Sequence, residues 1–510
     1  MIARRAAAAL AVAAMLLGIS ACAPATDPGW EPTAWPVIGT VTTEPASAAD
    51  AAPGTVDQRL RNDTVGIDAR WSALPGDQPI NDVIEKAVRD AVAVRSDASG
   101  AAYRPEAFPA GAGLAERGCT AGAATELAAD VLGDRAGTVV VCEVTVARGA
   151  VFAETLRTVI GSAGFVTSDS AETVYTDLST GVVGTASDLF ADVPALWTEM
   201  VDVLRRDAGS LSLESVQPPD ADQVAAALAG ELGRARFADG AVSVPVPAGL
   251  SAPELDGLVR WNARGTDRAL FVEFTPDEIS PVLTDLGRAV ATASGPFTGP
   301  TSAGAGFERM PCDLVPCMAM TLDDGPSTLT PTFLDVLRDQ HSAATFFMLG
   351  KNAQNHPDTV ARVAAEGHEI GNHTWDHPYL TDLTDAQIQA QLGNTRALLE
   401  RLSGQPIPFF RPPGGYVDDH VVALAGQSAI LWSVDTRDWA GPDAESLKRY
   451  AIDRPNPQTI MLMHDIQPVT ESVFADVVAG LRDRGFSLVT VDALFDGHVP
   501  PGIVRHGPLD

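Results

Sequence analysis

One stretch decides the fold of the second half of this chain: residues 318–326 read MAMTLDDGP. The largely apolar run Met318–Leu322 is typical of a buried strand, and the two carboxylates and the Gly-Pro turn that follow mark the point where this strand ends. Two Asp residues before Gly-Pro are also ordinary turn chemistry, so this pattern alone does not define a site.

Similar apolar runs recur after this stretch and alternate with helical segments. Repeated strand and helix units predict an α/β fold with a parallel sheet, closed here into a barrel-like form. Reactive residues of such folds lie at the carboxyl ends of the strands, and the polar clusters of this half fall at those ends. The runs are Met318–Leu322, Ala344–Leu349, Glu369–Asn372, Phe409–Arg411, Ala429–Val434, Ile460–Met463 and Ser487–Val491.

Two histidines, His373 and His377, lie four residues apart in the sequence HTWDH. We expect the two imidazoles to share one face of a helical turn and to point at one ion, although a pair of surface histidines has the same spacing. Two His and one Asp form a three-ligand set that leaves positions on a divalent metal open for water and substrate. A hydrolytic site needs such open positions.

Five polar clusters follow one another in an order that resembles the polysaccharide deacetylase family, also called the NodB-homology or carbohydrate esterase 4 group. The resemblance covers about Cys312 to Phe495, and five motifs in order on successive strand ends are not expected of unrelated surface residues. It implies a distorted (β/α) barrel as the catalytic domain. The clusters are Asp323-Asp324-Gly325-Pro326, His373-Thr374-Trp375-Asp376-His377, Arg411-Pro412-Pro413-Gly414-Gly415, Asp435-Thr436-Arg437-Asp438-Trp439 and Leu462-Met463-His464-Asp465.

The resemblance also implies a hydrolytic role for individual residues. Asp324, His373 and His377 would hold one divalent metal ion, with zinc preferred and cobalt, nickel or manganese as alternatives. Asp323 would be the general base that accepts a proton from the attacking water. His464 would be the acid that protonates the amine leaving group.

Two further residues would orient this base and this acid. By the same resemblance, Arg411 would pair with Asp323, and Asp438 would stabilise the imidazolium of His464. A buried structural role is the alternative for Arg411 and Asp438.

Four residues are expected to contact the substrate, and one of them departs from the family pattern. An aromatic residue often follows Arg-x-Pro in the family, but this chain has Gly414 there and Tyr416 two places later. The backbone NH of Gly414 could still donate to the developing oxyanion, whereas the aromatic wall that shapes the sugar site differs. Trp439 and Leu462 would line the acetyl pocket, with core packing as the alternative. Seven nearby residues are expected to be structural or solvated: Asp376, Asp435, Asp465, His341, His356, His368 and His420.

The composition of this 510-residue chain is that of a globular protein, with 45% hydrophobic and 20% charged residues. Its length predicts at least two domains. A net charge of −31 argues against a nucleic-acid groove, because binding phosphates requires clustered Lys and Arg. The sequence offers no sign of an oligomer.

The N-terminal residues predict export. A charged start, MIARR, is followed by an apolar run over residues 6–19 and by the sequence ISAC at residues 19–22. This is the layout of a secretory signal peptide, which is too short for a comfortable membrane span. Its end resembles a bacterial lipobox, in which Cys22 would be lipidated; an ordinary signal peptide with a chance Cys is the alternative. We therefore expect a lipoprotein on the outer face of the cell membrane, or a secreted protein.

The remaining chain divides by composition. The region before the catalytic half alternates strand-like and helix-like runs and contains no histidine, which favours a binding or spacing module without chemistry. Stretches rich in Pro, Gly, Ser and Thr flank it. The expected segments are a signal peptide (1–21), a linker (22–60), a smaller mixed α/β accessory domain (61–290), a second linker (291–311), the catalytic domain (312–498) and a tail (499–510).

Apart from Cys22, the chain has four cysteines, an even number that suits disulfides in an oxidising compartment. Four cysteines allow three pairings, and free buried thiols are a further alternative. The pairing between sequence neighbours is Cys119 with Cys142 and Cys312 with Cys317.

The function expected from these observations is removal of N-acetyl groups from an amino-sugar polymer of the cell envelope, with peptidoglycan N-acetylglucosamine preferred. A chitin-oligomer deacetylase and an acetylxylan esterase share the same five motifs. An alternative of another class is a non-catalytic envelope lipoprotein that binds or senses glycans, although such a binder has no need of a complete set of base, ligands and acid.

Overall fold

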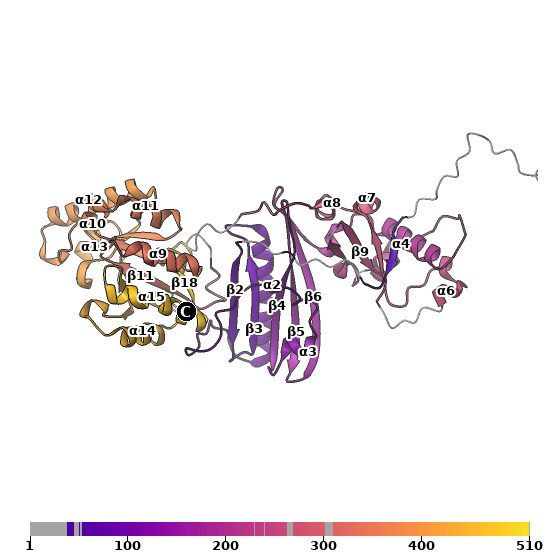
Figure 1. The fold of residues 1–510 in the computed structure, drawn as a ribbon, viewed down its shortest axis with the longest axis horizontal. Coiled ribbons are helices and arrows are strands. Elements are labelled where there is room, and N and C mark those ends of the chain that lie inside the picture. The colour runs from indigo at the N-terminus through magenta and orange to yellow at the C-terminus, as the bar shows by residue number, and fades with distance from the viewer. Residues whose placement is uncertain are drawn as a thin grey trace, which may run out of the picture.

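The computed structural model describes residues 38–44, 50, 54–228, 230–238, 240–262, 269–300 and 310–508. Within these residues the strands form three sheets, which follow one another along the long axis of the molecule (Figure 1). The predicted signal peptide and Cys22 lie outside the described residues. No helix in the described part of the chain is both long and apolar enough to span a membrane.

The C-terminal sheet has nine strands, and all of its pairings are parallel. Its order along the main path is β16-β17-β11-β12-β13-β14-β15-β19, and β18 pairs with β11. The curled parallel sheet confirms the predicted fold class. Its strands are β11 (Cys317–Asp323), β12 (Thr345–Met348), β13 (Glu369–Asn372), β14 (Phe409–Phe410), β15 (Ser428–Ile430), β16 (Val434–Asp435), β17 (Ile460–His464), β18 (Ser487–Val489) and β19 (Ile503–Val504).

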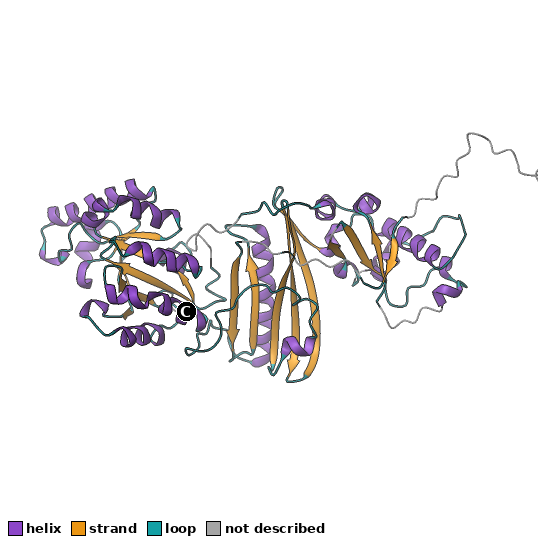
Figure 2. Ribbon diagram, viewed as in Figure 1, coloured by secondary structure: helices purple, strands orange, loops and turns teal. Residues whose placement is uncertain are grey.

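Helices surround this sheet, as Figure 2 shows. Helix α12 illustrates why they form where they do: the Thr384 and Gln387 side chains make a capping box at its start, and Gly404, with φ of 71°, ends it in the left-handed conformation. The helices are α9 (Thr330–Asp339), α10 (Gly350–Asn355), α11 (Pro357–Ala365), α12 (Asp385–Ser403), α13 (Asp419–Ala425), α14 (Ala444–Asp453), α15 (Pro468–Asp483) and α16 (Val491–Leu494).

The middle sheet has six strands in the order β2-β3-β4-β5-β6-β7. Helix α2 (Pro79–Ser99) packs on it through Ile80, Ile84, Val88 and Val92, which recur every four residues and share one face. The core of this sheet continues into the catalytic domain through residues such as Leu314 and Ile460. The strands are β2 (Val56–Asn62), β3 (Ile67–Ala73), β4 (Gly137–Arg148), β5 (Val151–Ser162), β6 (Phe165–Asp177) and β7 (Val182–Thr185), with α3 (Ala128–Leu132) beside β5.

The third sheet has four antiparallel strands in the order β1-β10-β9-β8. It packs with α4 (Val193–Asp207) and α5 (Ala221–Leu228) in a core of its own. The other elements are β1 (Thr40–Thr42), β8 (Arg236–Ala238), β9 (Ala241–Pro245), β10 (Phe271–Phe274), α6 (Val259–Asn262), α7 (Pro276–Ile279) and α8 (Asp285–Thr292).

The structure therefore differs from the expected segments in three places. Region 61–290 contains two sheets rather than one mixed α/β domain. The expected linker 22–60 contains β1 and the start of β2, and the expected tail 499–510 contains β19, which pairs with β15. Strands this short carry no periodicity of their own, since their positions depend on partners far away in the sequence.

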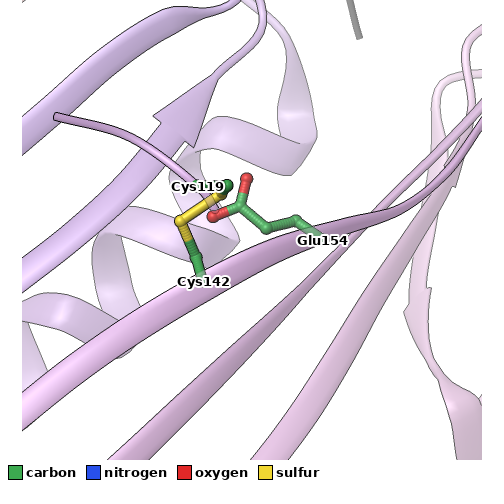
Figure 3. A group of neighbouring side chains, drawn as sticks. All are labelled: Cys119, Cys142 and Glu154. Atoms are coloured by element: carbon green, nitrogen blue, oxygen red, sulfur yellow. A yellow bond between two sulfur atoms is a disulfide. The ribbon is translucent and has the colours of Figure 1, made fainter. Parts of the chain in front are cut away.

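Both expected disulfides are present, Cys119–Cys142 and Cys312–Cys317, so the pairing between sequence neighbours is confirmed. The carboxylate of Glu154, on β5, lies against the Cys119–Cys142 bond (Figure 3). The Glu154 side chain is fully buried and accepts a 3.2 Å hydrogen bond from the backbone NH of Ser72. Burial raises the pKa of Glu154 well above its usual range, because the charged form loses its hydration.

Candidate active site

The end of β11 carries the two adjacent carboxylates into the site. In the sheet register, Asp323 lies opposite Phe347 of β12 and His464 of β17, so base and acid candidates lie on neighbouring strands. Asp324 then leaves the strand with φ of 73°. Its backbone is held on both sides, because its NH donates to the Phe347 carbonyl (3.1 Å) and its own carbonyl accepts from Asn352 Nδ2 (2.7 Å).

Three potential metal ligands converge at this edge of the sheet. The ligand atoms of Asp324, His373 and His377 all lie within 4.8 Å of one another. Nε2 of His373 lies 3.4 Å and Nε2 of His377 lies 3.6 Å from Oδ1 of Asp324. The Nδ1 atom of His373 is 2.7 Å from the carbonyl oxygen of Arg411, so its Nε2 is the nitrogen left to face the carboxylate.

The pKa shifts of Asp324 and His377 suit a bound cation, whereas burial would lower the pKa of His373 but the neighbouring Asp323 and Asp324 raise it. Burial alone would raise the pKa of Asp324, but the neighbouring imidazoles, His373 first among them, outweigh burial and lower it to about 2. Burial, together with the neighbouring His373, lowers the pKa of His377. Oδ1 of Asp324 is buried and accepts no well-formed hydrogen bond, which leaves an anionic oxygen directed at the space between the imidazoles.

The expectation that these histidines share a helical turn is wrong, because His373–His377 is a loop. Oδ1 of Asn372 accepts from the NH of Thr374 (2.9 Å), and Oγ1 of Thr374 accepts from the NH of His377 (3.1 Å). Thr374 and His377 both have positive φ, 69° and 71°. Side-chain acceptors therefore replace the helical hydrogen bonds and fold the loop so that both rings still meet at Asp324.

The structure brings Arg411 and Asp323 together. Nη1 of Arg411, directly after β14, donates to Oδ1 of Asp323 (2.8 Å) and to Oγ1 of Thr321 (2.6 Å). The guanidinium is fully buried, donates to the carbonyls of Ile430 and Leu431, and lies 4.0 Å from the centre of the Phe347 ring. Five contacts hold the guanidinium of Arg411 in place. Arg411 therefore fixes Oδ1 of Asp323, and the other oxygen, Oδ2, faces the site.

The structure also brings His464 and Asp438 together. Nδ1 of His464 lies 2.7 Å from Oδ1 of Asp438, and the backbone NH of His464 donates to Oδ2 (2.8 Å). Thr470 donates to the same Oδ2 at 2.6 Å. Burial lowers the pKa of His464, but the hydrogen bond and charge of Asp438, with the nearby Asp323 and Asp324, more than offset this and raise it to about 9.

Comparisons with known proteins match the C-terminal region that carries these groups. The family model described as polysaccharide deacetylase matches residues 312–430. A peptidoglycan-N-acetylglucosamine deacetylase from Bacillus cereus is 38% identical over 186 residues, which span 35% of this chain and 87% of that protein. This chain belongs to the polysaccharide deacetylase family. It is therefore a hydrolase, as the sequence motifs predicted.

Other polysaccharide deacetylases match the same region. The peptidoglycan-N-acetylmuramic acid deacetylase PdaC of Bacillus subtilis is 34% identical over 178 residues, which span 35% of this chain but only 38% of that longer protein. A solved T48 deacetylase with substrate is 38% identical and covers 39% of this chain and 97% of its own, with a TM-score of 0.36.

The four residues expected at the substrate of this deacetylase differ in exposure. Gly414 adopts φ of 62° within a short 3-10 helix, Pro413–Gly415, a conformation that favours glycine. Tyr416 and Trp439 are exposed, whereas Leu462 is buried in β17 beside Thr321. Tyr416 and Trp439 are thus accessible to a ligand, whereas the contact expected between Leu462 and the acetyl group stays a prediction.

Asp465 lies beside Gly325, at the turn that follows the two carboxylates of the first motif. It was expected to be structural, and it does support the turn at Gly325: its carboxylate oxygens would lie 2.3 Å from a Cβ at that glycine. Thr330 donates to its carboxylate, and Ser327 Oγ donates to its carbonyl (2.9 Å). Burial, with the nearby charges of Asp324 and Asp323, raises the pKa of Asp465 to about 7.

Tyr379, an exposed aromatic residue two places after His377, was not identified from the sequence. Its ring centre lies 4.6 Å from that of Tyr416. No spacing rule pointed to it, since Tyr379 and Tyr416 belong to different motif loops. The other histidines expected to be structural lie apart from the ligands; His368, for example, is buried, and burial lowers its pKa to about 4.

Proposed function

We propose that this protein is a metal-dependent deacetylase that removes N-acetyl groups from an amino-sugar polymer of the cell envelope, with peptidoglycan N-acetylglucosamine as the substrate. The observation that carries the proposal is the pairing of Asp323 with Arg411 and of His464 with Asp438 on adjacent strands. A relative named for that substrate, from Bacillus cereus, supports the choice of polymer.

The residues present fit a bound metal ion. Deacetylases of this family are generally metal-dependent, and one carboxylate with two imidazole nitrogens is a donor set suited to zinc that leaves positions open for water and substrate. Asp324, His373 and His377 would hold the ion. When bound, it would polarise the acetyl carbonyl and make a coordinated water more acidic.

The remaining chemistry belongs to side chains of this chain. Hydrolysis of an amide requires a group that accepts a proton from water and another that gives a proton to the departing amine. Asp323 serves as the acceptor, because Arg411 orients it and leaves Oδ2 free of that contact. His464 serves as the donor: Asp438 engages its Nδ1, so Nε2 carries the transferable proton.

The location proposed is the outer face of the cell membrane, with a lipid on Cys22. The support is the charged start, apolar run and ISAC sequence of the first 22 residues. Two disulfides in the folded part of the chain suit an oxidising compartment outside the cytosol.

The test is acetate release by the full-length, zinc-loaded protein from purified peptidoglycan, N-acetylglucosamine oligomers and acetylated xylan, measured side by side. We expect release from the first two substrates and little from xylan. The proposal fails if the protein binds glycans but releases no acetate from any of them, because it would then be a binding protein that keeps the fold. Preferred turnover of acetylated xylan would make it an esterase instead.

A further inference from the structure

Several aromatic side chains of the catalytic domain are exposed to solvent. Among the described residues of the catalytic domain, four aromatic side chains are strongly exposed: Tyr379 (48%), Tyr416 (55%), Trp439 (57%) and Tyr450 (40%). Three of these lie in the motif loops: Tyr379 is two residues after His377, Tyr416 is five residues after Arg411, and Trp439 directly follows Asp438. Exposed aromatic groups concentrated at one place mark a binding surface more often than chance.

Tyr379 and Tyr416 form a pair over Gly414. Their ring centres are 4.6 Å apart and the planes are tilted by 50°. A Cβ atom at Gly414 would lie 3.0 Å from Cε1 of Tyr379 and 3.0 Å from Cδ2 of Tyr416. A side chain at residue 414 would therefore force the two rings to shift, at the position where relatives in this family often carry an aromatic residue.

The backbone beneath the two rings is anchored although the rings themselves are not buried. Leu380, next to Tyr379, is fully buried in a small core that includes Phe410 of β14. Val417, next to Tyr416, packs partly buried against the same core. One core thus holds both loops, and two aromatic rings kept in place while facing solvent lose little conformational entropy on binding a ligand.

We propose that Tyr379 and Tyr416 form an aromatic platform for a second sugar ring of the polymer, next to the sugar that is deacetylated, and that Tyr379 determines specificity for oligomers over single sugars. The apolar C–H face of a β-linked pyranose matches the face of an aromatic ring, and the two phenol groups can bond its hydroxyls. Short chain segments join Tyr379 to His377 and Tyr416 to Arg411, which keeps the platform near the catalytic centre. This inference rests on the proposed function for its substrate.

The kinetic test compares a chain of sugars with a small acetyl ester on the full-length, zinc-loaded protein. For Tyr379→Ala, the ratio of kcat/KM on N-acetylglucosamine hexamer to kcat/KM on 4-nitrophenyl acetate should fall about tenfold, mainly through KM, as expected for loss of an aromatic contact. Tyr379→Phe keeps the ring and should retain most of the ratio. Gly414→Ala should lower the ratio because its Cβ pushes the two rings apart.

Tyr450→Ala is the matched control, because Tyr450 is an exposed tyrosine on α14 that no motif loop carries. It should leave the ratio unchanged. An unchanged ratio in both Tyr379→Ala and Tyr416→Ala, with unfolding temperatures equal to wild type, overturns the platform. A wild-type protein that cleaves the ester but no glycan would instead count against the proposed function.

A binding measurement keeps the platform testable independently of turnover. Calorimetric titration of the hexamer into Asp323→Asn, with and without Tyr379→Ala, should show about a tenfold weaker Kd for the double variant. Equal Kd values would overturn the platform even if the wild-type enzyme is active. If the double variant binds the hexamer more weakly but the wild-type protein releases no acetate, the platform is supported and only the proposed function is refuted.

Discussion

Oδ1 of Asp438 lies 2.7 Å from Nδ1 of His464, and the other oxygen of the same carboxylate accepts from the backbone NH of His464. The carboxylate therefore holds both the ring and the backbone of this histidine. Because Asp438 is fully buried, its charge acts on the imidazole with little screening by water. This pair determines the protonation state of the acid and leads to the first prediction.

Replacing Asp438 by Asn should move the alkaline limb of the kcat/KM profile to lower pH. The pKa of His464 is raised to about 9, and the carboxylate of Asp438 is the main cause that raises it. Without this charge the imidazolium loses its proton at lower pH, so the donor is lost earlier as pH rises. The measurement is acetate release from N-acetylglucosamine oligomers across pH. Asp435→Asn, a nearby carboxylate without contact to His464, is the control, and an unmoved limb in Asp438→Asn refutes the assignment.

The same pair makes a prediction about stability. The folded pKa of His464, about 9, exceeds the value of 6.5 expected for an unfolded histidine. The stabilisation is therefore fully present below pH 6.5 and is lost as pH rises through about 9. Urea unfolding of the metal-free protein at a series of pH values should show this decline, and His464→Gln should flatten it. If the stability of His464→Gln declines in the same way with rising pH, groups other than His464 cause the decline.

Replacing Asp323 by Asn should remove nearly all activity, by about 10²- to 10⁴-fold, because the water loses its proton acceptor. The metal ligands are untouched, so zinc content measured by atomic emission should remain at the wild-type level. His464→Ala should likewise keep zinc and lose turnover. Near wild-type turnover in Asp323→Asn would show that another group is the base.

Removing one metal ligand should lower the zinc content and the activity together, whereas Asp323→Asn should lower the activity alone. His373→Ala is the sharpest change, since this ring is buried and oriented by the Arg411 carbonyl. His356→Ala, outside the converging set, should keep both. A crystal structure with zinc should place the ligand atoms of Asp324, His373 and His377 at about 2.0–2.2 Å from the ion. Full zinc content in His373→Ala would contradict this ligand set.

Replacing Cys22 by Ala should release the protein from the membrane fraction, since the lipid would be attached to that thiol. The released protein should retain its acetate release on oligomers, because the catalytic residues lie far along the chain. Fractionation with immunodetection measures the first outcome and acetate assay the second. Unchanged membrane retention would refute lipid anchoring at Cys22.

The sequence predicted the parallel α/β fold of the catalytic half, and its family resemblance pointed to the residues of the candidate site; the pairing of cysteines close in sequence was one of the options that it left open. Each predicted apolar run from Met318 onward overlaps a parallel strand, because burial on both faces of such a sheet demands continuous apolar residues. The site residues lie at strand ends, so the strands and the family motifs predicted their positions: Asp323 and His464 end β11 and β17, and Asp324 and Arg411 directly follow β11 and β14.

Tertiary structure decided what depends on contacts between distant residues. The two sheets that precede the catalytic domain depend on pairings such as that of β1 with β10, which local composition does not reveal. The loop at His373–His377 follows from hydrogen bonds of Asn372 and Thr374 rather than from the helical spacing of its histidines. The Tyr379–Tyr416 pair needs two separate loops to pack on one core and a glycine between them. Sequence patterns report which residues are buried, whereas the folded chain alone determines which of them meet.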